Sequence, residues 1–261
     1  MLFDLIDFHI HCGMQHNTSY PTDAVSRAVL SSPVKKAVIS SLSSIATPDY
    51  GENDLLELSV WPEFVLTYWL NPYLKDWPQR VDCLQKRFKL AGIKLHPTAN
   101  IYEPTKAFLD PVFHYCRENK LFITYHTDTF RSTPLKLTEL LIDYPDVDVV
   151  LIHMDDPINS IFLAKRFPNV YLETSWIERK WKSMAPVRIA LDSVDNSKIF
   201  FGTDFPYGFD IDRMAIEGES VRTYEDITSY YTELLPSETA ENILYWNARR
   251  FLERYGIAFE D

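Results

Sequence analysis

The sequence predicts a single (β/α)8 barrel, regular or distorted, that spans residues 1–261. Eight short apolar segments have the length and composition of buried parallel strands, and eight is the number that closes such a barrel. Amphipathic segments with helical periodicity alternate with several of them. No linker, low-complexity stretch or block of like charge divides the chain into smaller domains.

The expected strands are mostly runs of β-branched and aromatic residues, which favour the extended conformation. They are residues 2–11, 37–42, 64–70, 92–96, 122–126, 148–153, 170–174 and 199–202. An open, doubly wound sheet is the alternative architecture. It normally has fewer strands and a glycine-rich first turn, whereas this chain has only 7 glycines and no loop that would cradle a phosphate.

The expected helices are amphipathic segments between and after these strands. They are residues 110–119, 134–143, 157–167, 224–235 and 237–255. Residues 46–63 are irregular, so we expect a loop and a short helix there. Asp156 stands directly before Pro157, and an acid before a proline is typical of the N-terminal cap of a helix.

The composition disfavours several classes of protein. A net charge of −11 and a pI of about 5.1 disfavour nucleic acid as a partner. Cys12, Cys83 and Cys116 are widely spaced and odd in number, so we expect free thiols in a reducing compartment. The N-terminus lacks signal-peptide features, and no apolar stretch reaches the roughly 18 residues of a membrane span. We therefore expect a soluble cytoplasmic protein, compatible with a homodimer.

The first expected strand ends in two alternating histidines, within Asp7-Phe8-His9-Ile10-His11. Residues i and i+2 of a strand point to the same face, so His9 and His11 should project side by side. Two adjacent imidazoles are awkward in a core but form half of a good metal site.

Polar side chains recur at the ends of later strands. In a (β/α)8 barrel the C-terminal ends of the strands carry the functional side chains. Five of the 7 histidines fall at such ends. The complete set is His9, His11, Lys94, His96, His126, His153 and Asp204. We therefore predict that these side chains form one site.

Five motifs occur along the chain in a recognisable order. They are D-x-H-x-H at residues 7–11, G-I-K-L-H-P at 92–97, the strand-ending histidines 126 and 153, G-T-D-x-P at 202–206, and W-N-A-R-R-F at 246–251. In these motifs the chain resembles the amidohydrolase superfamily, in particular its amidohydrolase-related branch (amidohydrolase 2) of TIM-barrel, metal-dependent hydrolases and decarboxylases. The resemblance implies four metal ligands, which are His9, His11, His126 and Asp204. It also implies that His153 lies near the metal or polarises the substrate.

The chemistry of these residues agrees with the implied roles. Three imidazoles and one carboxylate suit Zn²⁺, with Mn²⁺ or Fe²⁺ as alternatives, and leave a position for water. Such a water loses its proton near neutral pH, and Asp204 can accept it as general base. His153 can donate to an oxygen of the substrate. We expect one bound ion rather than two.

Three further residues have roles that the sequence leaves open. In some relatives the lysine equivalent to Lys94 is carboxylated and bridges two metals, and in others it is unmodified and contacts substrate or an acid. A buried lysine needs its charge paired or removed, and both arrangements achieve this. His96 either reaches the substrate or packs at a strand end. Arg131, just after the fifth strand, is the candidate to bind a substrate anion.

These features predict an enzyme that acts on a small molecule. The first hypothesis is a metal-dependent hydrolase that cleaves an ester, lactone or amide bond with a metal-activated water. The alternative is a metal-dependent lyase for the non-oxidative decarboxylation of an aromatic or unsaturated acid. We favour the hydrolase because the chain is too short for the long loops of many decarboxylating relatives. A third hypothesis is a binding scaffold without activity. No motif in the loops 13–21, 46–54, 175–184 and 207–220 identifies the substrate.

Overall fold

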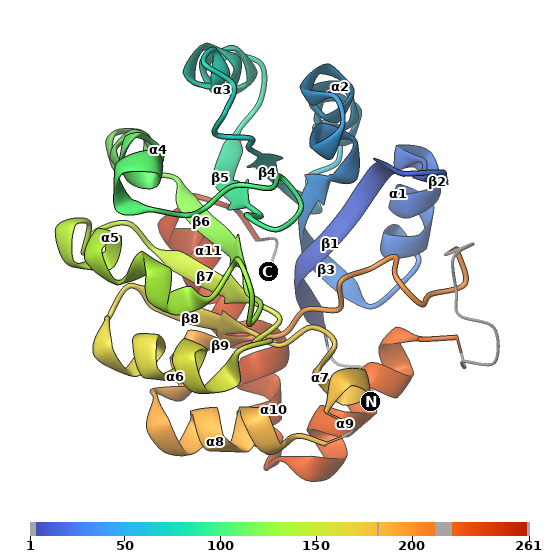
Figure 1. Cartoon of the computed structure of the whole chain (residues 1–261). Helices are drawn as coiled ribbons and strands as arrows, with labels where there is room; N and C mark the ends of the chain where they lie inside the picture. Colours follow the sequence, from blue (N-terminus) through green and yellow to red (C-terminus); the bar gives the residue numbers. More distant parts are fainter. Residues whose placement is uncertain (1–3, 182, 212–220, 260–261) are drawn as a thin grey trace.

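A computed structural model describes residues 4–181, 183–211 and 221–259, and these residues form the expected barrel (Figure 1). The strands are β1 (Leu5–Gln15), β2 (Thr18–Tyr20), β3 (Val34–Ser41), β4 (Phe64–Trp69), β5 (Leu90–Leu95), β6 (Phe122–His126), β7 (Val149–Ile152), β8 (Val170–Glu173) and β9 (Ile199–Phe200). They form one sheet in the order β2-β1-β3-β4-β5-β6-β7-β8-β9. The long strand β1 and the strands from β3 to β9 run parallel, and each corresponds to one expected strand.

The first strand differs from the expected one at its end. It continues past His11 to Gln15, because its last residues pair antiparallel with β2, for example Gly13 with Tyr20. Residues 2 and 3 of the expected strand lie outside the described residues. The hairpin of β1 and β2 therefore builds part of the barrel mouth that the sequence predicted as a loop.

Hydrogen bonds bring the two ends of the sheet together. The amide of Phe8 donates to the carbonyl of Phe201 at 2.9 Å, and the amide of Asp204 donates to the carbonyl of His9 at 2.8 Å. The amide of His11 donates to the carbonyl of Phe205 at 2.6 Å. The chain after β9 thus runs along β1, and this contact places Asp204 beside the two histidines.

Helices surround the strands in the alternating order that the barrel requires (Figure 1). They are α1 (Thr22–Leu30), α2 (Pro48–Leu58), α3 (Trp77–Gln85), α4 (Lys106–Asn119), α5 (Thr138–Asp143), α6 (Pro157–Arg166), α7 (Ile177–Lys180), α8 (Ala185–Ser193), α9 (Tyr224–Leu234), α10 (Ser237–Glu241) and α11 (Asn247–Arg254). Short 3-10 turns cover Leu42–Ile45, Pro134–Leu137 and Asn196–Lys198. The described helices include none that is both long and apolar enough to cross a membrane.

One helical expectation needs correction. Residues 46–63 contain the 11-residue helix α2 rather than a short one, and Pro48 occupies its first turn. The expected helical segment 237–255 is confirmed as far as Arg254, with a π-helical turn at Asn242–Trp246 between α10 and α11. The remaining expected helices are confirmed, and Asp156 caps α6 by accepting a hydrogen bond from the amide of Asn159.

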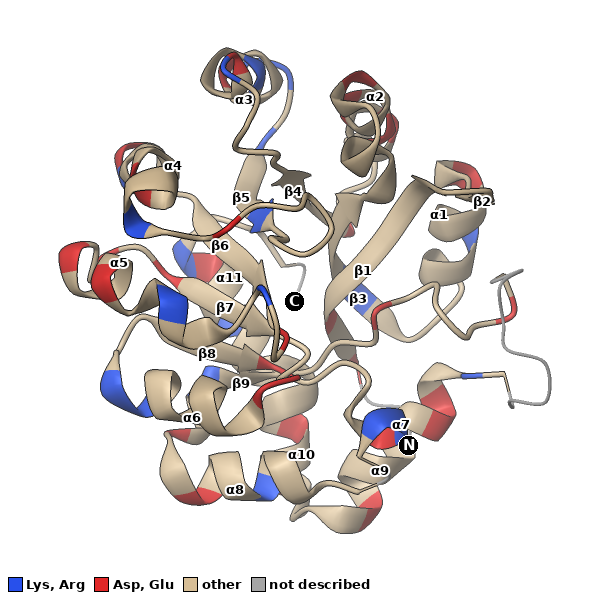
Figure 2. Cartoon of the chain, viewed as in Figure 1, with Lys and Arg blue, Asp and Glu red and all other residues tan. Residues whose placement is uncertain are grey.

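A compact apolar cluster fills the N-terminal end of the barrel. Its aromatic members include Phe8, Phe122, Phe200 and Phe251 of α11, and the rings of Phe8 and Phe200 are 4.8 Å apart. In Figure 1, α11 lies behind the strands. Charged residues lie mostly on the outer helices (Figure 2). Because apolar packing closes one end of the barrel, the polar residues of its interior gather at the C-terminal end.

An irregularity in β1 turns its histidines toward that end. The register of β1 against β3 shifts between Asp7 and Ile10. Phe8 belongs to the cluster inside the barrel, whereas Ile10 packs in the larger cluster toward the helices. A bulge of this kind re-aims the side chains that follow it. His9 and His11 consequently share one face, as predicted, and that face is the interior of the barrel mouth.

Candidate metal centre

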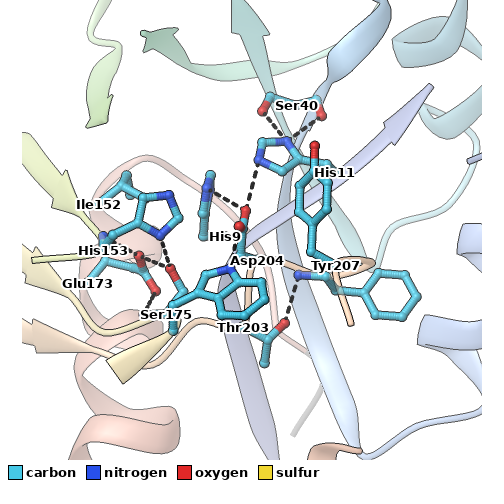
Figure 3. A network of polar contacts seen from close by, with 12 residues as sticks. His9, His11, Ser40, Ile152, His153, Glu173, Ser175, Thr203, Asp204 and Tyr207 are labelled. Atoms are coloured by element: carbon cyan, nitrogen blue, oxygen red, sulfur yellow. Dashed lines mark hydrogen bonds and ion pairs between the residues drawn. The ribbon is translucent and has the colours of Figure 1, made fainter. Parts of the chain in front are cut away.

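His9, His11 and Asp204 form a compact group of potential metal ligands at the barrel mouth (Figure 3). One ligand atom from each lies within 4.8 Å of the other two. Oδ1 of Asp204 is 3.2 Å from Nε2 of His9 and 3.2 Å from Nε2 of His11. All three residues are buried. The structure therefore brings together three of the four ligands that the resemblance implies.

Neighbouring groups orient these three side chains. Nδ1 of His11 lies 3.1 Å from the carbonyl oxygen of Ser40, so Nδ1 carries the proton and the Nε2 lone pair faces Asp204. The indole Nε1 of Trp176 donates to Oδ2 of Asp204 at 2.6 Å, which leaves Oδ1 directed at the histidines. Sequence reasoning missed the roles of Ser40 and Trp176, because they follow from contacts between distant segments.

Charge and burial act in opposite directions on Asp204. Burial alone would raise the pKa of its carboxyl group, but the interactions with the neighbouring His153, His11 and His9 hold the pKa well below its usual range. Burial, together with the charges of Lys94 and His11, holds the pKa of His9 well below its usual range. The centre therefore presents a carboxylate beside neutral imidazole, which is the state that binds a cation.

Asp7 fixes the backbone from which Asp204 projects. Its Oδ1 accepts from the amide of Thr203 at 3.0 Å, and its Oδ2 accepts from the hydroxyl of Tyr224 at 2.9 Å. Asp204 itself has a left-handed backbone conformation, with φ of 60°. Burial raises the pKa of Asp7 to about 6. The first acid of the D-x-H-x-H motif is thus a structural partner of the loop after β9 rather than a ligand in this group.

His153 stands on the other side of His9, with a ring-centroid distance of 5.0 Å (Figure 3). Its backbone is left-handed, with φ of 74°, and its amide donates to Oε2 of Glu173 at 3.0 Å. Its Nδ1 is 2.7 Å from Oγ of Ser175. Burial lowers the pKa of His153 to about 3. Glu173 and Ser175 are polar residues at and just after the end of an apolar strand. This pattern was the sequence signal that could have identified them as partners of His153.

His126 lies in the same site but is separate from the compact ligand group. Its ring stacks on His96 at 3.6 Å between centroids and lies 4.9 Å from the ring of His153. Among the described residues, the group of close ligand atoms does not include His126. The ring of His96 also stacks on Trp69 at 5.3 Å. Burial holds the pKa of both His96 and His126 well below the usual range.

Lys94 is a buried amine at the centre of the barrel. Its Nζ has no hydrogen-bond partner among the described residues and lies 5.8 Å from the ring of Trp69. Burial lowers the pKa of Lys94 to about 7, against the opposing effects of Asp204 and Glu173. An amine of this kind is partly neutral at physiological pH, which is compatible with both roles predicted from the sequence.

Arg131 lies in the loop after β6, away from the compact ligand group. Its guanidinium lies 5.6 Å from the ring of Phe130, and its carbonyl accepts from Lys136. The described contacts of Arg131 do not include the histidines of the site. Its role as an anion-binding residue stays a prediction.

A cavity of about 500 Å³ adjoins the site through His96. Residues of the β1–β2 hairpin and of the segment before α2 line it, including Gln15, His16 and Thr47. Met14 and Tyr50, whose side chains are exposed, also line the cavity. Concave spaces of this size beside a polar cluster are typical of small-molecule sites.

Comparison with known proteins identifies the family. The sequence profile described as "Amidohydrolase" matches residues 79–254. The curated "Protein fluG" of Emericella nidulans is 28% identical over 133 residues, which are 47% of this chain and 15% of that protein. This chain therefore spans only a small part of that relative's length.

Solved structures share the fold. An uncharacterised TIM-barrel protein of Bordetella bronchiseptica superimposes with a TM-score of 0.72 and 16% identity, covering 97% of this chain and 99% of that one. A probable 2-pyrone-4,6-dicarboxylic acid hydrolase of Acinetobacter baumannii gives 0.67 and 15%, covering 97% and 99%. A 5-carboxyvanillate decarboxylase of Novosphingobium aromaticivorans, complexed with manganese, gives 0.63 and 10%, covering 88% and 79%. These similarities confirm the TIM-barrel fold.

Proposed function

The chain belongs to the amidohydrolase family, and from this premise we propose that it is a metal-dependent hydrolase of an ester, lactone or amide bond in a small molecule. The observation that carries the proposal is the convergence of His9, His11 and Asp204 at the barrel mouth, with ligand atoms within 4.8 Å of one another. Membership of a family of enzymes favours activity over a binding scaffold.

The described residues fit a divalent cation. Nε2 of His9 is buried and has no hydrogen-bond partner in the described part of the chain, although it lies 3.2 Å from the carboxylate of Asp204. A cation bound between these groups would satisfy that nitrogen. The imidazole and carboxylate donors favour Zn²⁺, with Mn²⁺ or Fe²⁺ as alternatives. We propose one ion, with His126 as the fourth ligand.

The residues of the site have separate roles in the proposed hydrolysis. A bound divalent cation supplies Lewis acidity and lowers the pKa of a coordinated water. Asp204, held by Trp176, accepts the proton of the attacking water as general base. His153 faces the substrate from the opposite side and stabilises or protonates the departing oxygen. The cavity beside His96 receives the remainder of the substrate.

Decarboxylation of an aromatic or unsaturated acid is the second candidate. The similarity to a manganese-containing decarboxylase in fold supports it, because the same barrel holds that chemistry. In this reaction the ligand group would bind the substrate carboxylate, and Asp204 or His153 would protonate carbon. Release of CO2 from a panel of hydroxybenzoates, without hydrolysis of lactones or esters, would establish the lyase instead.

The first experiment is elemental analysis of protein purified without chelator, followed by an Asp204→Asn variant. About one ion per chain and loss of ester hydrolysis in the variant support the proposal. Asp23→Asn, at an exposed position on α1, is the matched control and should retain both the bound ion and ester hydrolysis. Full turnover by Asp204→Asn on a substrate of the native protein would exclude this mechanism.

Other properties of the protein follow from the same proposal. The three cysteines of the chain are free in the structure, which agrees with the proposed reducing, cytoplasmic location. We propose that residues 1–261 act as one domain on a small-molecule substrate, without nucleic acid or membrane as partner. Sedimentation analysis would test whether the chain is a homodimer.

A further inference from the structure

A continuous chain of hydrogen bonds connects His153 to a buried carboxyl group (Figure 3). Oγ of Ser175 is 2.7 Å from Nδ1 of His153 and 2.8 Å from Oε2 of Glu173. Both Ser175 and Glu173 are fully buried. Glu173 is the last residue of β8 and Ser175 follows it by two residues, and both side chains turn toward His153. The path from carboxyl to imidazole contains one hydroxyl group.

The surrounding backbone is built to hold this carboxyl group. Oε2 of Glu173 accepts from the amide of His153 at 3.0 Å, and Oε1 accepts from the amide of Ser175 at 2.5 Å. Gly202 provides the space, because a Cβ atom there would lie 2.0 Å from Oε1. The carboxyl group is therefore fixed in position, and only its proton is free to move.

Protonation of a leaving group by His153 requires a second proton at its Nδ1. Its Nδ1 lies 2.7 Å from the hydroxyl of Ser175, and this contact joins the imidazole to the carboxyl group of Glu173. A neutral imidazole can give up the proton on Nε2 only if Nδ1 receives another one. Burial raises the pKa of Glu173 to about 8, against the hydrogen bonds from His153 and Ser175, so this carboxyl group carries a proton near pH 7.

We propose that Glu173 is the proton reservoir of the site, and that Ser175 relays its proton to Nδ1 of His153 while Nε2 of His153 protonates the leaving group. The inference rests on the proposed hydrolysis. His153 is the catalytic residue, since it faces the substrate, and Glu173 and Ser175 act through it.

The relay balances in protons and charge. The O–H bond of Glu173 breaks as Oγ of Ser175 gains a proton, and the original hydroxyl proton of Ser175 passes to Nδ1 of His153. The Nε2–H bond of His153 breaks as the leaving oxygen gains its proton. Glu173 ends as a carboxylate, while Ser175 and His153 stay neutral. Asp204 then releases the proton that it took from water, and a proton that enters at Nε2 of His153 restores Glu173 by the reverse relay.

Substrates that differ only in their leaving group test the relay. Phenyl acetate releases a more basic oxygen than 4-nitrophenyl acetate, so it depends more on protonation. We expect Glu173→Gln and Ser175→Ala each to lower kcat for phenyl acetate by about 10²-fold, the scale of general acid catalysis. The loss for 4-nitrophenyl acetate should be much smaller. Equal losses on both esters would reduce Glu173 and Ser175 to structural residues and overturn the proposal.

Ser160→Ala is the matched control for these variants. Ser160 lies in α6, is fully buried, and its hydroxyl has no hydrogen-bond partner in the described part of the chain. Removing this hydroxyl should leave kcat for both esters unchanged. If Glu173→Gln does not fold, Ser175→Ala still interrupts the path at its middle atom.

A spectroscopic test separates this inference from the proposed hydrolysis. ¹⁵N NMR distinguishes the two imidazole tautomers of His153 in the resting, metal-loaded protein, whether or not any ester is cleaved. We expect Nε2–H while Glu173 is protonated and Nδ1–H once it ionises near pH 8, with Ser175→Ala removing this pH dependence. A native tautomer that is the same on both sides of this pH would overturn the relay, even if esters are hydrolysed.

Other charges near Glu173 must be controlled in that titration. The groups that act on it or respond to it include Asp7 on β1, Lys94 on β5 and His153 after β7. Lys94 is the important one, because its pKa is about 7. The tautomer change should persist in Lys94→Met if Glu173 drives it. Its disappearance in Lys94→Met, with Glu173 intact, would assign the change to Lys94 and contradict the proposal.

Discussion

A hydrogen bond from an indole holds one carboxylate oxygen of Asp204. Trp176 donates to Oδ2 of Asp204 at 2.6 Å, and Oδ1 is then left to face His9 and His11. Partners that orient a ligand in this way typically change metal affinity by 10–100-fold when they are lost. The sequence indicated Asp204, but the residue that aims it comes from another loop.

Replacing Trp176 should therefore weaken metal binding while the fold persists. We expect Trp176→Phe to lower the affinity for Zn²⁺ by about 10–100-fold, because the ring remains and only the donor is lost. Competition with a chromophoric chelator measures the affinity. Trp181→Phe, at a half-exposed position of the same segment, is the control. Unchanged affinity in Trp176→Phe would mean that Asp204 is oriented by other contacts.

The buried amine of Lys94 should make the stability of the metal-free protein depend on pH. The pKa of Lys94 is about 7 in the folded state and about 10.5 when unfolded, so between these values the unfolded chain binds more protons. The free energy of unfolding should then rise with pH over that window, by about 1.4 kcal/mol for each pKa unit. Urea titrations at pH 7 and pH 10 measure it.

Lys94→Met should remove this dependence and stabilise the metal-free protein at pH 7. The variant keeps the length of the side chain but has no charge to bury. Lys86→Met, at an exposed position, should leave the pH dependence intact. If the free energy of unfolding depends on pH in the same way in the native protein and in Lys94→Met, this prediction is wrong.

At the scale of elements, α11 packs against the N-terminal end of the barrel and closes it. Phe251 contacts the rings of Phe8, Phe122 and Phe200 with centroid distances of 5.1 to 5.5 Å. The motif W-N-A-R-R-F thus contributes to the fold, because its last residue fills the end of the barrel opposite the site. Asn247 of the same motif donates to the carbonyls of Asn196 and Ile199 and ties α11 to β9.

Truncation of Phe251 should be strongly destabilising. We expect Phe251→Ala to lower the free energy of unfolding by about 3–5 kcal/mol, because a buried ring leaves a cavity among aromatic neighbours. Trp246→Ala, at an exposed position just before α11, should cost far less. Chemical denaturation of both variants measures the difference, and similar losses would mean that α11 does not seal the core.

At the scale of the whole molecule, loops from several strands build the cavity beside the site. The hairpin after β1, the segment before α2 and the loop after β5 all contribute to its wall. Among the described residues that line it, none is an acid, a lysine or an arginine. The cavity is therefore suited to an uncharged portion of a substrate.

A bulky residue in the cavity should discriminate between substrates by size. Thr47→Trp should raise KM for 1-naphthyl acetate by about tenfold or more, since lost pocket contacts of a few methylenes are worth 1–3 kcal/mol. KM for methyl acetate and the metal content of the protein should be unchanged. Thr232→Trp, on the exposed face of α9, is the control. Equal KM changes for both esters would place the substrate elsewhere.

Much of the fold and of the candidate site could be predicted from sequence because both depend on local patterns. Runs of apolar residues identified the eight strands, and β6 has the expected bounds. The helix at Pro48–Leu58 was underestimated because its apolar positions are few and a glycine interrupts it. The hairpin with β2 was missed because its pairing depends on contacts across a turn that no hydrophobic pattern marks.

The sequence by itself determined the type of barrel and the candidate residues at its strand ends, because strand ends of a parallel barrel meet on one face whatever lies between them. Only the tertiary structure decided how those residues are arranged. It brought Asp204 to His9 and His11 through hydrogen bonds between the first strand and the chain after the last. It also set His126 apart with His96, and joined His153 to Glu173 through Ser175. These relations depend on distances between segments that are far apart in the chain, and local sequence patterns do not encode such distances.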